Sequence, residues 1–282
     1  MRKYGEVFHE LRITRGLSIV ELADDMVSKS AISRFERMES DIAFEKFIHI
    51  LEKLKVSMDE FVYLSSKKQK EKSSLELLST SIINNDPDML RKLIDNEWDS
   101  FKVNRDIYSR LIATVLECHY KNMKGEEVQF NSNLQSLTDY FFRCQLWTQF
   151  DVVLFSDSMA YLPIDTAIVM SKEIVNKTKE FHNNRQSLET IINTLENITM
   201  VCLENGRIKD AKDFLTIIDQ LDMDETFIFE RLIFKFIKGL YKIKSGNEIE
   251  GKKIAEESLY AMHLAESFNF ERIFREYLDK YI

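Results

Sequence analysis

Glycine and proline are scarce in this sequence. Its 282 residues include seven glycines and two prolines, whereas folds built from strands and tight turns need many such residues at their turns. Leucine, isoleucine, lysine and glutamate are abundant instead, a composition typical of helical proteins. The sequence therefore predicts an all-α protein, and its length predicts about two domains.

Residues that bind metals or perform covalent chemistry are also few. The three cysteines, Cys118, Cys144 and Cys202, are far apart and form no C-x-x-C pair, so neither a zinc knuckle nor a disulfide framework is indicated. The five histidines are scattered, and the chain has no glycine-rich phosphate loop, nucleophile elbow or H-E-x-x-H motif. We therefore expect no metal, no cofactor and no enzymatic activity.

Long apolar runs are missing as well. No stretch reaches the roughly 20 apolar residues that a membrane-spanning helix needs. The first 15 residues are amphipathic and charged, unlike the apolar core of a signal peptide. These two features predict a cytoplasmic protein with no membrane partner.

The chain carries no excess of positive charge. Its formal net charge is −8, and residues 1–65 contain 10 Lys and Arg against 12 Asp and Glu, a net charge of −2. Lysine and arginine supply the non-specific part of nucleic-acid affinity. Any contact with DNA must therefore rest on a short stretch of the chain.

Residues 1–65 have the pattern of a small helical domain. Apolar residues recur at helical spacing in five segments, near 4–11, 19–26, 32–35, 44–51 and 58–64. Ser18 with Glu21 and Ser57 with Glu60 have the spacing of capping boxes, which start helices. The run 66–74 has no apolar residue, and this predicts a linker to a second domain over 75–282.

Residues 75–282 have the pattern of successive helices of 12–20 residues. We expect helices near 87–98, 104–123, 131–143, 147–160, 164–181, 186–205, 208–221, 225–245, 248–266 and 268–281. Breaks at Asn205-Gly206 and Ser245-Gly246 lie 40 residues apart, a spacing typical of tetratricopeptide-like stacks of helical hairpins. An irregular helical bundle is the alternative.

One segment of residues 1–65, which we call the head, has the pattern of a helix-turn-helix motif. After the helix that starts at Ile19 and a tight turn near Val27, a short helix places Ile32 and Phe35 on one face. Its other face is polar, and residues 28–37 have a net charge of +2. Such a helix fits the major groove of B-DNA, which is about 12 Å wide. A solvated charged face without function is the alternative.

Roles within this motif follow from position along the helix. The N-terminal residues of a recognition helix meet base edges, which assigns base readout to Lys29 and Ser30, with Ser33 next. Arg34 and Arg37 lie further along and are expected to contact phosphates. The candidate DNA-binding residues are Arg12, Arg15, Ser28, Lys29, Ser30, Ser33, Arg34, Arg37 and Lys46.

The head resembles the lambda-repressor/Cro type of helix-turn-helix domain through LRITRGLSIVELAD, SKSAISRFER and FEKFIHILEKLKVSMDEF. The run Ser28–Arg37 and the stretch LWTQFDVVLF around Trp147 are similar to the Rgg/GadR/MutR family of Gram-positive regulators. Two positions depart from repressor-type heads. Ile19 replaces a common glutamine and Ala43 a common serine or threonine, which leaves the contacts to the DNA backbone less defined.

This resemblance implies a homodimeric regulator whose helical-repeat domain binds a short peptide pheromone, as in quorum sensing. In related receptors asparagines hold the peptide backbone. Asn193 and Asn197 are four apart on one helix face, and an amide side chain both donates and accepts. Arg143 and Arg185 are candidates to pair with a peptide carboxylate. The alternative is that both asparagines are exposed and bind no ligand.

The leading hypothesis is a transcription regulator that binds double-stranded DNA as a homodimer. A peptide bound to the helical repeats would control its affinity for DNA or its recruitment of RNA polymerase. Two alternatives remain open. One is a protein-interaction adaptor, and the other is a dimeric regulator that needs no peptide.

Overall fold

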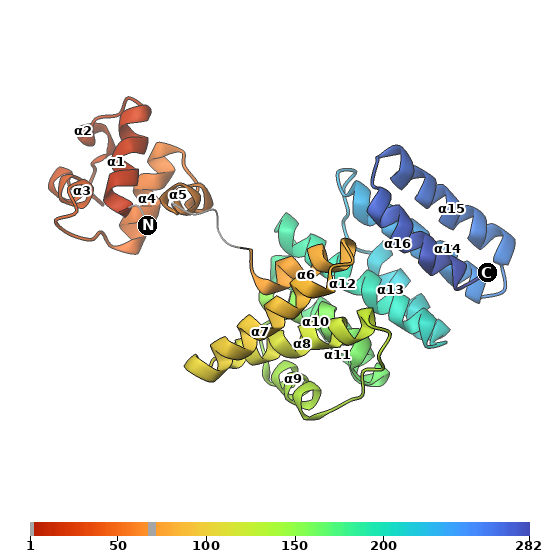
Figure 1. The fold of residues 1–282 in the computed structure, drawn as a ribbon. Helices are drawn as coiled ribbons and strands as arrows, with labels where there is room; N and C mark the ends of the chain where they lie inside the picture. Colours follow the sequence, from red (N-terminus) through yellow and green to blue (C-terminus); the bar gives the residue numbers. More distant parts are fainter. Residues whose placement is uncertain (1–2, 67–71) are drawn as a thin grey trace. The chain divides into compact units, whose positions relative to one another are not determined.

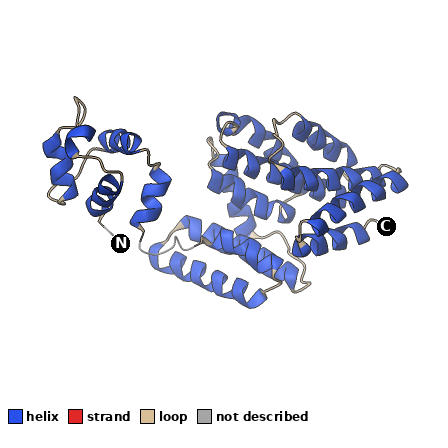
Figure 2. Cartoon of the chain, turned by 90° about the horizontal axis from the view of Figure 1, so that it is seen from above, coloured by secondary structure: helices blue, strands red, loops and turns tan. Residues whose placement is uncertain are grey.

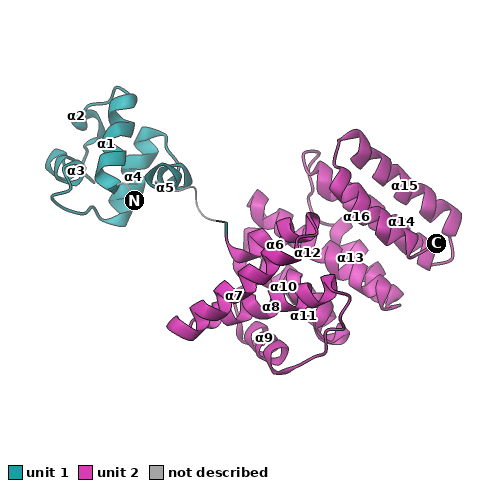
Figure 3. Ribbon diagram, viewed as in Figure 1, with its two compact units in different colours: residues 1–72 teal, residues 73–282 magenta. Residues whose placement is uncertain are grey.

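The computed structural model describes residues 3–66 and 72–282, and every regular element in these ranges is a helix (Figure 2). The chain divides into two compact units, residues 1–72 and 73–282 (Figure 3). Five residues of the expected linker, 67–71, lie outside the described residues. The predicted all-α fold class is confirmed. No helix in the described ranges is long and apolar enough to cross a membrane.

In its described residues the first unit contains five helices, which Figure 1 labels. Their buried side chains form one apolar core. The helices are α1 (Tyr4–Thr14), α2 (Ile19–Leu22), α3 (Lys29–Glu36), α4 (Phe44–Leu54) and α5 (Met58–Ser65). The side chains of Phe8, Leu22, Ile32, Ile50 and Leu54 are almost completely buried. Burial of this kind supplies most of the driving force for folding so small a domain.

The predicted helix starts are present. Ser18 and Ser57 each form a capping box, with Glu21 and Glu60 respectively. The expected extent of the second helix is wrong, because α2 ends at Leu22 and not near Met26. A carboxylate oxygen of Asp24 accepts hydrogen bonds from the backbone N–H groups of Met26 and Val27, at 3.0 and 3.1 Å. These bonds hold the backbone in a turn that competes with the helix.

The second unit contains eleven α-helices. They are α6 (Ser74–Ile83), α7 (Pro87–Asn104), α8 (Ile107–Met123), α9 (Ser132–Arg143), α10 (Gln149–Ser158), α11 (Ile164–Lys177), α12 (Arg185–Glu204), α13 (Ile208–Asp219), α14 (Ile228–Lys244), α15 (Glu248–Leu264) and α16 (Phe268–Asp279). Helix α6 has no counterpart among the expected helices, and it starts inside the run expected to be a linker. Ser73 starts it through a capping box with Glu76.

Antiparallel hairpins and a central row of helices organise this unit. Neighbours in sequence pair as α7 with α8, α12 with α13 and α14 with α15, while α8, α10, α12 and α14 contact one another in that order. The contact between α14 and α15 is close because it involves Gly239 and Gly251. A Cβ atom at Gly239 would lie 2.8 Å from the carbonyl oxygen of Gly251. Helix α12 thus lies at the centre of the unit, between α10 and α14.

Candidate nucleic-acid interface and peptide surface

Helix α3 presents an apolar face to the core and a polar face to solvent. Ile32 and Phe35 are buried, whereas Lys29, Ser30 and Arg34 are exposed. Ser28 caps the helix, because its Oγ accepts from the N–H of Ala31 at 3.2 Å. The cap uses the hydroxyl of Ser28 as an acceptor for one of the backbone N–H groups that the first turn of α3 leaves unpaired.

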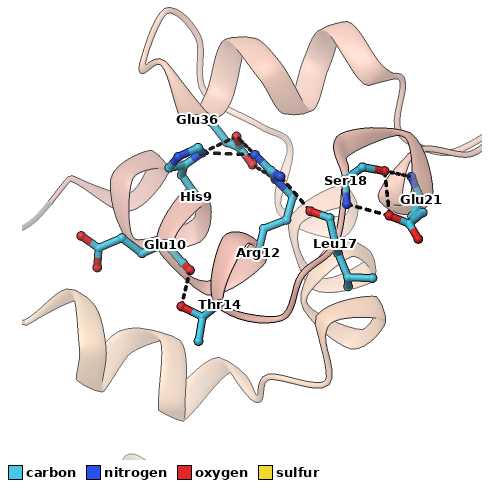
Figure 4. Close-up of polar contacts among 8 residues, drawn as sticks. All are labelled: His9, Glu10, Arg12, Thr14, Leu17, Ser18, Glu21 and Glu36. Atoms are coloured by element: carbon cyan, nitrogen blue, oxygen red, sulfur yellow. Dashed lines mark hydrogen bonds and ion pairs between the residues drawn. The ribbon is translucent and has the colours of Figure 1, made fainter.

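Two contacts between α1 and α3 fix the position of the recognition helix. The first is a close backbone approach, since a Cβ atom at Gly5 would lie 2.1 Å from the carbonyl oxygen of Phe35. The second is the ion pair of Arg12 with Glu36, in which Nε and Nη2 donate to the two carboxylate oxygens at 2.6 and 2.7 Å (Figure 4). Both contacts join residues more than 20 positions apart in sequence.

The structure corrects the phosphate role that the sequence suggested for Arg12. Its side chain is buried, and Nη1 donates to the carbonyl oxygen of Leu17 at 2.8 Å (Figure 4). His9 also reaches Glu36, with 2.8 Å between Nδ1 and Oε2. Burial alone would raise the carboxyl pKa of Glu36, but the hydrogen bonds from Arg12 and His9 outweigh it and lower the pKa. Arg12 is a structural residue that joins α1 to α3.

Asp24 plays a second positioning role that sequence reasoning missed. While one oxygen of its carboxylate holds the turn before α3, the other lies 2.6 Å from Nε2 of His49 and 3.0 Å from Nζ of Lys53. These hydrogen bonds, that of His49 first, hold the pKa of Asp24 well below its usual range. Lys53 also donates to the carbonyl oxygen of Leu22 at 2.7 Å. The cluster ties the turn to α4.

The remaining candidate cations differ in how free their side chains are to contact DNA. The side chains of Lys29, Arg34 and Lys46 are exposed, and they form no hydrogen bond or ion pair with any residue in ranges 3–66 and 72–282. Arg37 is exposed but already paired, since Nε and Nη2 donate to the carboxylate of Glu39 at 2.8 and 2.9 Å. Arg15 makes a single long contact, 3.4 Å from Nη2 to the carbonyl oxygen of Lys55. Ser33 is half-buried.

In the second unit the two candidate asparagines share one face of α12. Asn193 is half-buried, and Asn197 is exposed and donates from Nδ2 to Oγ of Ser156 on α10 at 3.0 Å. This bond places the asparagine face of α12 beside α10. Arg143 is exposed at the end of α9, and nothing in the structure joins it to these asparagines.

Arg185, a candidate to pair with a peptide carboxylate, contacts other residues of this chain. Its Nε donates to Glu189 at 2.9 Å, and its other nitrogens donate to the hydroxyl and the carbonyl oxygen of Thr226. The guanidinium carbon lies 4.4 Å from the ring centroid of Phe227. Arg185 therefore fixes the segment before α14 through three of its five N–H donors.

Sequence reasoning missed a pair of buried acids between α12 and α14. Glu196 is 2% exposed, and neither of its carboxylate oxygens has a hydrogen-bond partner in the described residues. Burial, reinforced by the charge of Glu230 on α14, raises the pKa of Glu196 well above its ordinary value. An unpaired charge is costly to bury, so this position favours the neutral, protonated form of the Glu196 carboxyl. No cluster of three His, Cys, Asp or Glu side chains in the described ranges could hold a metal ion.

Comparison with known families identifies both units. A family model for the C-terminal domain of the HTH-type transcriptional regulator Rgg matches residues 90–276, and a helix-turn-helix family model matches residues 8–61. The chain belongs to the Rgg family. It is a helix-turn-helix transcriptional regulator and not an enzyme, as the sequence predicted.

Solved structures of several regulators share the fold over the whole chain. A crystal structure of the SHP pheromone receptor Rgg2 of Streptococcus dysgalactiae is 22% identical, with a TM-score of 0.81 and full coverage of both chains. A protein of Listeria monocytogenes EGD-e assigned as a transcriptional regulator is 17% identical, with a TM-score of 0.85 and coverage of 99% of this chain and 97% of the other. PrgX in complex with cCF10 is 17% identical, with a TM-score of 0.72 and coverage of 100% and 92%. At these identities the likeness establishes the fold.

Proposed function

We propose that this Rgg-family regulator binds operator DNA through α3 and that a short peptide bound on α12 controls it. The DNA-binding proposal rests on one observation, the exposed and unpaired polar side chains of α3. Lys29, Ser30 and Arg34 are exposed, the two cations are unpaired within the described residues, and the helix that bears them is fixed by the Arg12–Glu36 ion pair. A rigid helix with free donors is suited to the major groove. A protein that acts on DNA in this way is proposed to be cytoplasmic.

Each head offers few free cations, so a single head is expected to bind DNA weakly. We propose a homodimer, whose two heads would read half-sites about one helical turn apart. Of the candidate contacts, Lys29 and Ser30 are assigned to base edges, Ser33 to a nearby base or phosphate, and Arg34, Lys46 and Arg15 to phosphates. Contact with RNA polymerase is a further hypothesis, which applies if the protein is an activator.

Mobility-shift titrations at two or more salt concentrations test the DNA-binding proposal. Arg34→Ala should weaken binding to all sequences and reduce the salt slope by about 0.9, the value for one phosphate contact. Lys29→Ala should relax the preference at one or two base pairs by about 1–3 kcal/mol per lost contact. Lys209→Ala, which removes an exposed cation on α13, is the matched control. Equal salt slopes for Arg34→Ala and the wild type would contradict the phosphate assignment.

The peptide proposal rests on the family fold and on the face of α12. The solved relatives with this fold include a pheromone receptor and a complex of PrgX with cCF10. Asn193 and Asn197 offer amide groups that can donate and accept hydrogen bonds along an extended peptide backbone. The side chain of Asn193 forms no hydrogen bond within the described residues and that of Asn197 forms only one, so both amides can form further hydrogen bonds.

Mass spectrometry of molecules released from the purified native protein, followed by calorimetry with the synthetic peptide found, tests the peptide proposal. Asn193→Ala and Asn197→Ala should each weaken binding by about tenfold, since each removes hydrogen bonds worth roughly 1 kcal/mol or more. Gln220→Ala, at an exposed amide after α13, is the control. Full affinity in both asparagine variants would rule out this face. Absence of any released peptide, with DNA binding intact, would favour the dimeric regulator that needs no peptide.

A further inference from the structure

A cavity of about 290 Å³ lies in the second unit, where the first turns of α10 and α12 meet the short helix η2 (Lys179–Phe181). Its polar lining comes from Thr148, Gln149, Thr178, Asn184, Ser187 and Thr190. None of these side chains is charged. The cavity has the size and lining of a site for one small group, with hydroxyl and amide donors around it.

Trp147 lines this cavity and has an unused donor. Its side chain is 1% exposed, and no described residue accepts a hydrogen bond from its Nε1–H. The indole ring is held by Phe141 and Phe155, each with a centroid distance of 5.4 Å. A buried N–H without an acceptor is costly. An acceptor on a ligand would remove this cost.

Two groups near the cavity favour a negatively charged ligand. Helix α12 starts there with the uncharged cap Asn184, so the partial positive charge of its N-terminus is not neutralised by the cap. The ammonium group of Lys177 lies 5.9 Å from the ring centroid of Trp147. The start of α10 contributes less, because the carboxylate of Asp151 already accepts from Thr148. The acceptor that suits this field is an anion.

We propose that the cavity binds the free C-terminal carboxylate of the peptide, an inference that rests on the proposed peptide binding. The carboxylate would accept from Nε1 of Trp147 and from the hydroxyls around it. The last side chain of the peptide would lie against Val152, Phe181 and Ile191, which form the apolar wall of the cavity.

The position of the cavity fits a peptide that also reaches the asparagine face. Ser187 and Asn197 are ten residues apart on α12, which corresponds to about 15 Å along the helix axis. An extended peptide covers this distance in four to five residues. One short peptide can therefore place its carboxylate in the cavity and its backbone beside Asn193 and Asn197.

Two synthetic pools test the inference on the full-length protein. Both contain N-acetylated octapeptides of uncharged residues that end in leucine, one as free acids and one as C-terminal amides. Retention on the immobilised protein is measured by mass spectrometry. We expect about tenfold preference for the acids, the effect of one hydrogen bond to a charged group. Trp147→Phe keeps an aromatic ring but removes the N–H, and should abolish this preference. Trp98→Phe is the matched control, because the Trp98 N–H donates to Glu117 away from the cavity.

Every outcome of this experiment is decisive. Equal retention of acids and amides that depends on Asn193 and Asn197 would overturn the carboxylate site and leave peptide binding intact. An acid preference that survives in Trp147→Phe would also overturn it. Retention of neither pool would count against both proposals. N-acetyl-leucine alone is a further probe. If it stabilises the wild type but not Trp147→Phe, and the acid pool is not retained, then the cavity binds a small carboxylate and the peptide assignment is wrong.

Discussion

Arg12 and Glu36 form a buried, two-point ion pair that joins α1 to the recognition helix α3. Removal of Arg12 would leave the buried carboxylate of Glu36 with His9 as its remaining side-chain partner, so Arg12→Ala should destabilise the first unit by about 3–5 kcal/mol. Both tryptophans lie in the second unit, and their fluorescence therefore reports the second unit alone. Denaturation followed by far-UV circular dichroism, compared with tryptophan fluorescence, isolates the loss in the first unit.

The double variant Arg12→Leu with Glu36→Leu separates structure from DNA contact. Replacement of a buried ion pair by apolar residues is often neutral for stability, so this variant should recover most of the loss. Its DNA affinity should then show the salt slope of the wild type. A slope reduced by about 0.9 would instead return Arg12 to the list of phosphate contacts.

Gly5 allows α1 and α3 to touch through their backbones. Gly5→Ala would place a Cβ atom 2.1 Å from the carbonyl oxygen of Phe35, so α3 must move. We expect a loss of about 3 kcal/mol in the first unit, at the upper end for overpacking, together with weaker DNA binding. Gly16→Asn serves as control, because Gly16 has open space around it, a φ of +69°, and a backbone conformation that asparagine tolerates. Equal losses in both variants would argue against a steric cause at Gly5.

The ion pair of Arg37 with Glu39 restrains one cation of the candidate interface. Glu39→Gln should free Arg37 for a phosphate, so mobility shifts should show tighter binding at low salt and a salt slope steeper by about 0.9. Glu52→Gln removes an exposed negative charge from α4 and controls for net charge alone. An identical gain in both variants would mean that Arg37 makes no new contact with DNA.

The sequence could predict what is local and could not predict what joins distant segments. Ser18 and Ser57 start helices as their neighbours indicated, because capping depends on residues three positions apart. Arg12 was misassigned because its partner is 24 residues away, and an unpaired arginine on a helix looks like a phosphate contact. The contact of Arg185 with Thr226 could not be predicted for the same reason, since Thr226 lies 41 residues away.

Other features could not be predicted for related reasons. Helix α2 is four residues shorter than expected because Asp24 forms a turn with the backbone of Met26 and Val27. The residue types alone give little sign of whether a helix or such a turn will form. In the sequence, Glu196 looks like any other acidic residue of a helix. Its burial and its neighbour Glu230 on α14, 34 positions later, are known only from the structure. The cavity beside Trp147 combines side chains from three helical segments. Long-range packing of this kind leaves no periodic signal in the sequence.

The buried carboxyl of Glu196 predicts that the second unit loses stability as pH rises. Its pKa in the folded protein is raised by burial and by Glu230, whereas the unfolded chain has an ordinary glutamate pKa near 4.3. Between these two values the unfolded state has released a proton that the folded state keeps. The free energy of unfolding should therefore fall by about 1.4 kcal/mol per pH unit from this group, and the loss should be absent below about pH 4.

Glu196→Gln tests this pH dependence, with tryptophan fluorescence during denaturation at pH 5 to 8 as the measurement. The variant should have a shallower dependence and a larger free energy of unfolding at pH 8, because a neutral amide replaces a group that costs energy to keep protonated. Burial raises the pKa of Asp157 to about 7 and also raises the pKa of Glu204. Both groups therefore contribute to the pH dependence of the wild-type free energy of unfolding. The difference between the wild type and Glu196→Gln gives the contribution of Glu196. Asp157→Asn is the matched comparison, since it should reduce the slope only below about pH 7. If Glu196→Gln keeps the full wild-type slope, Glu196 is ionised in the folded protein and must have a cationic partner.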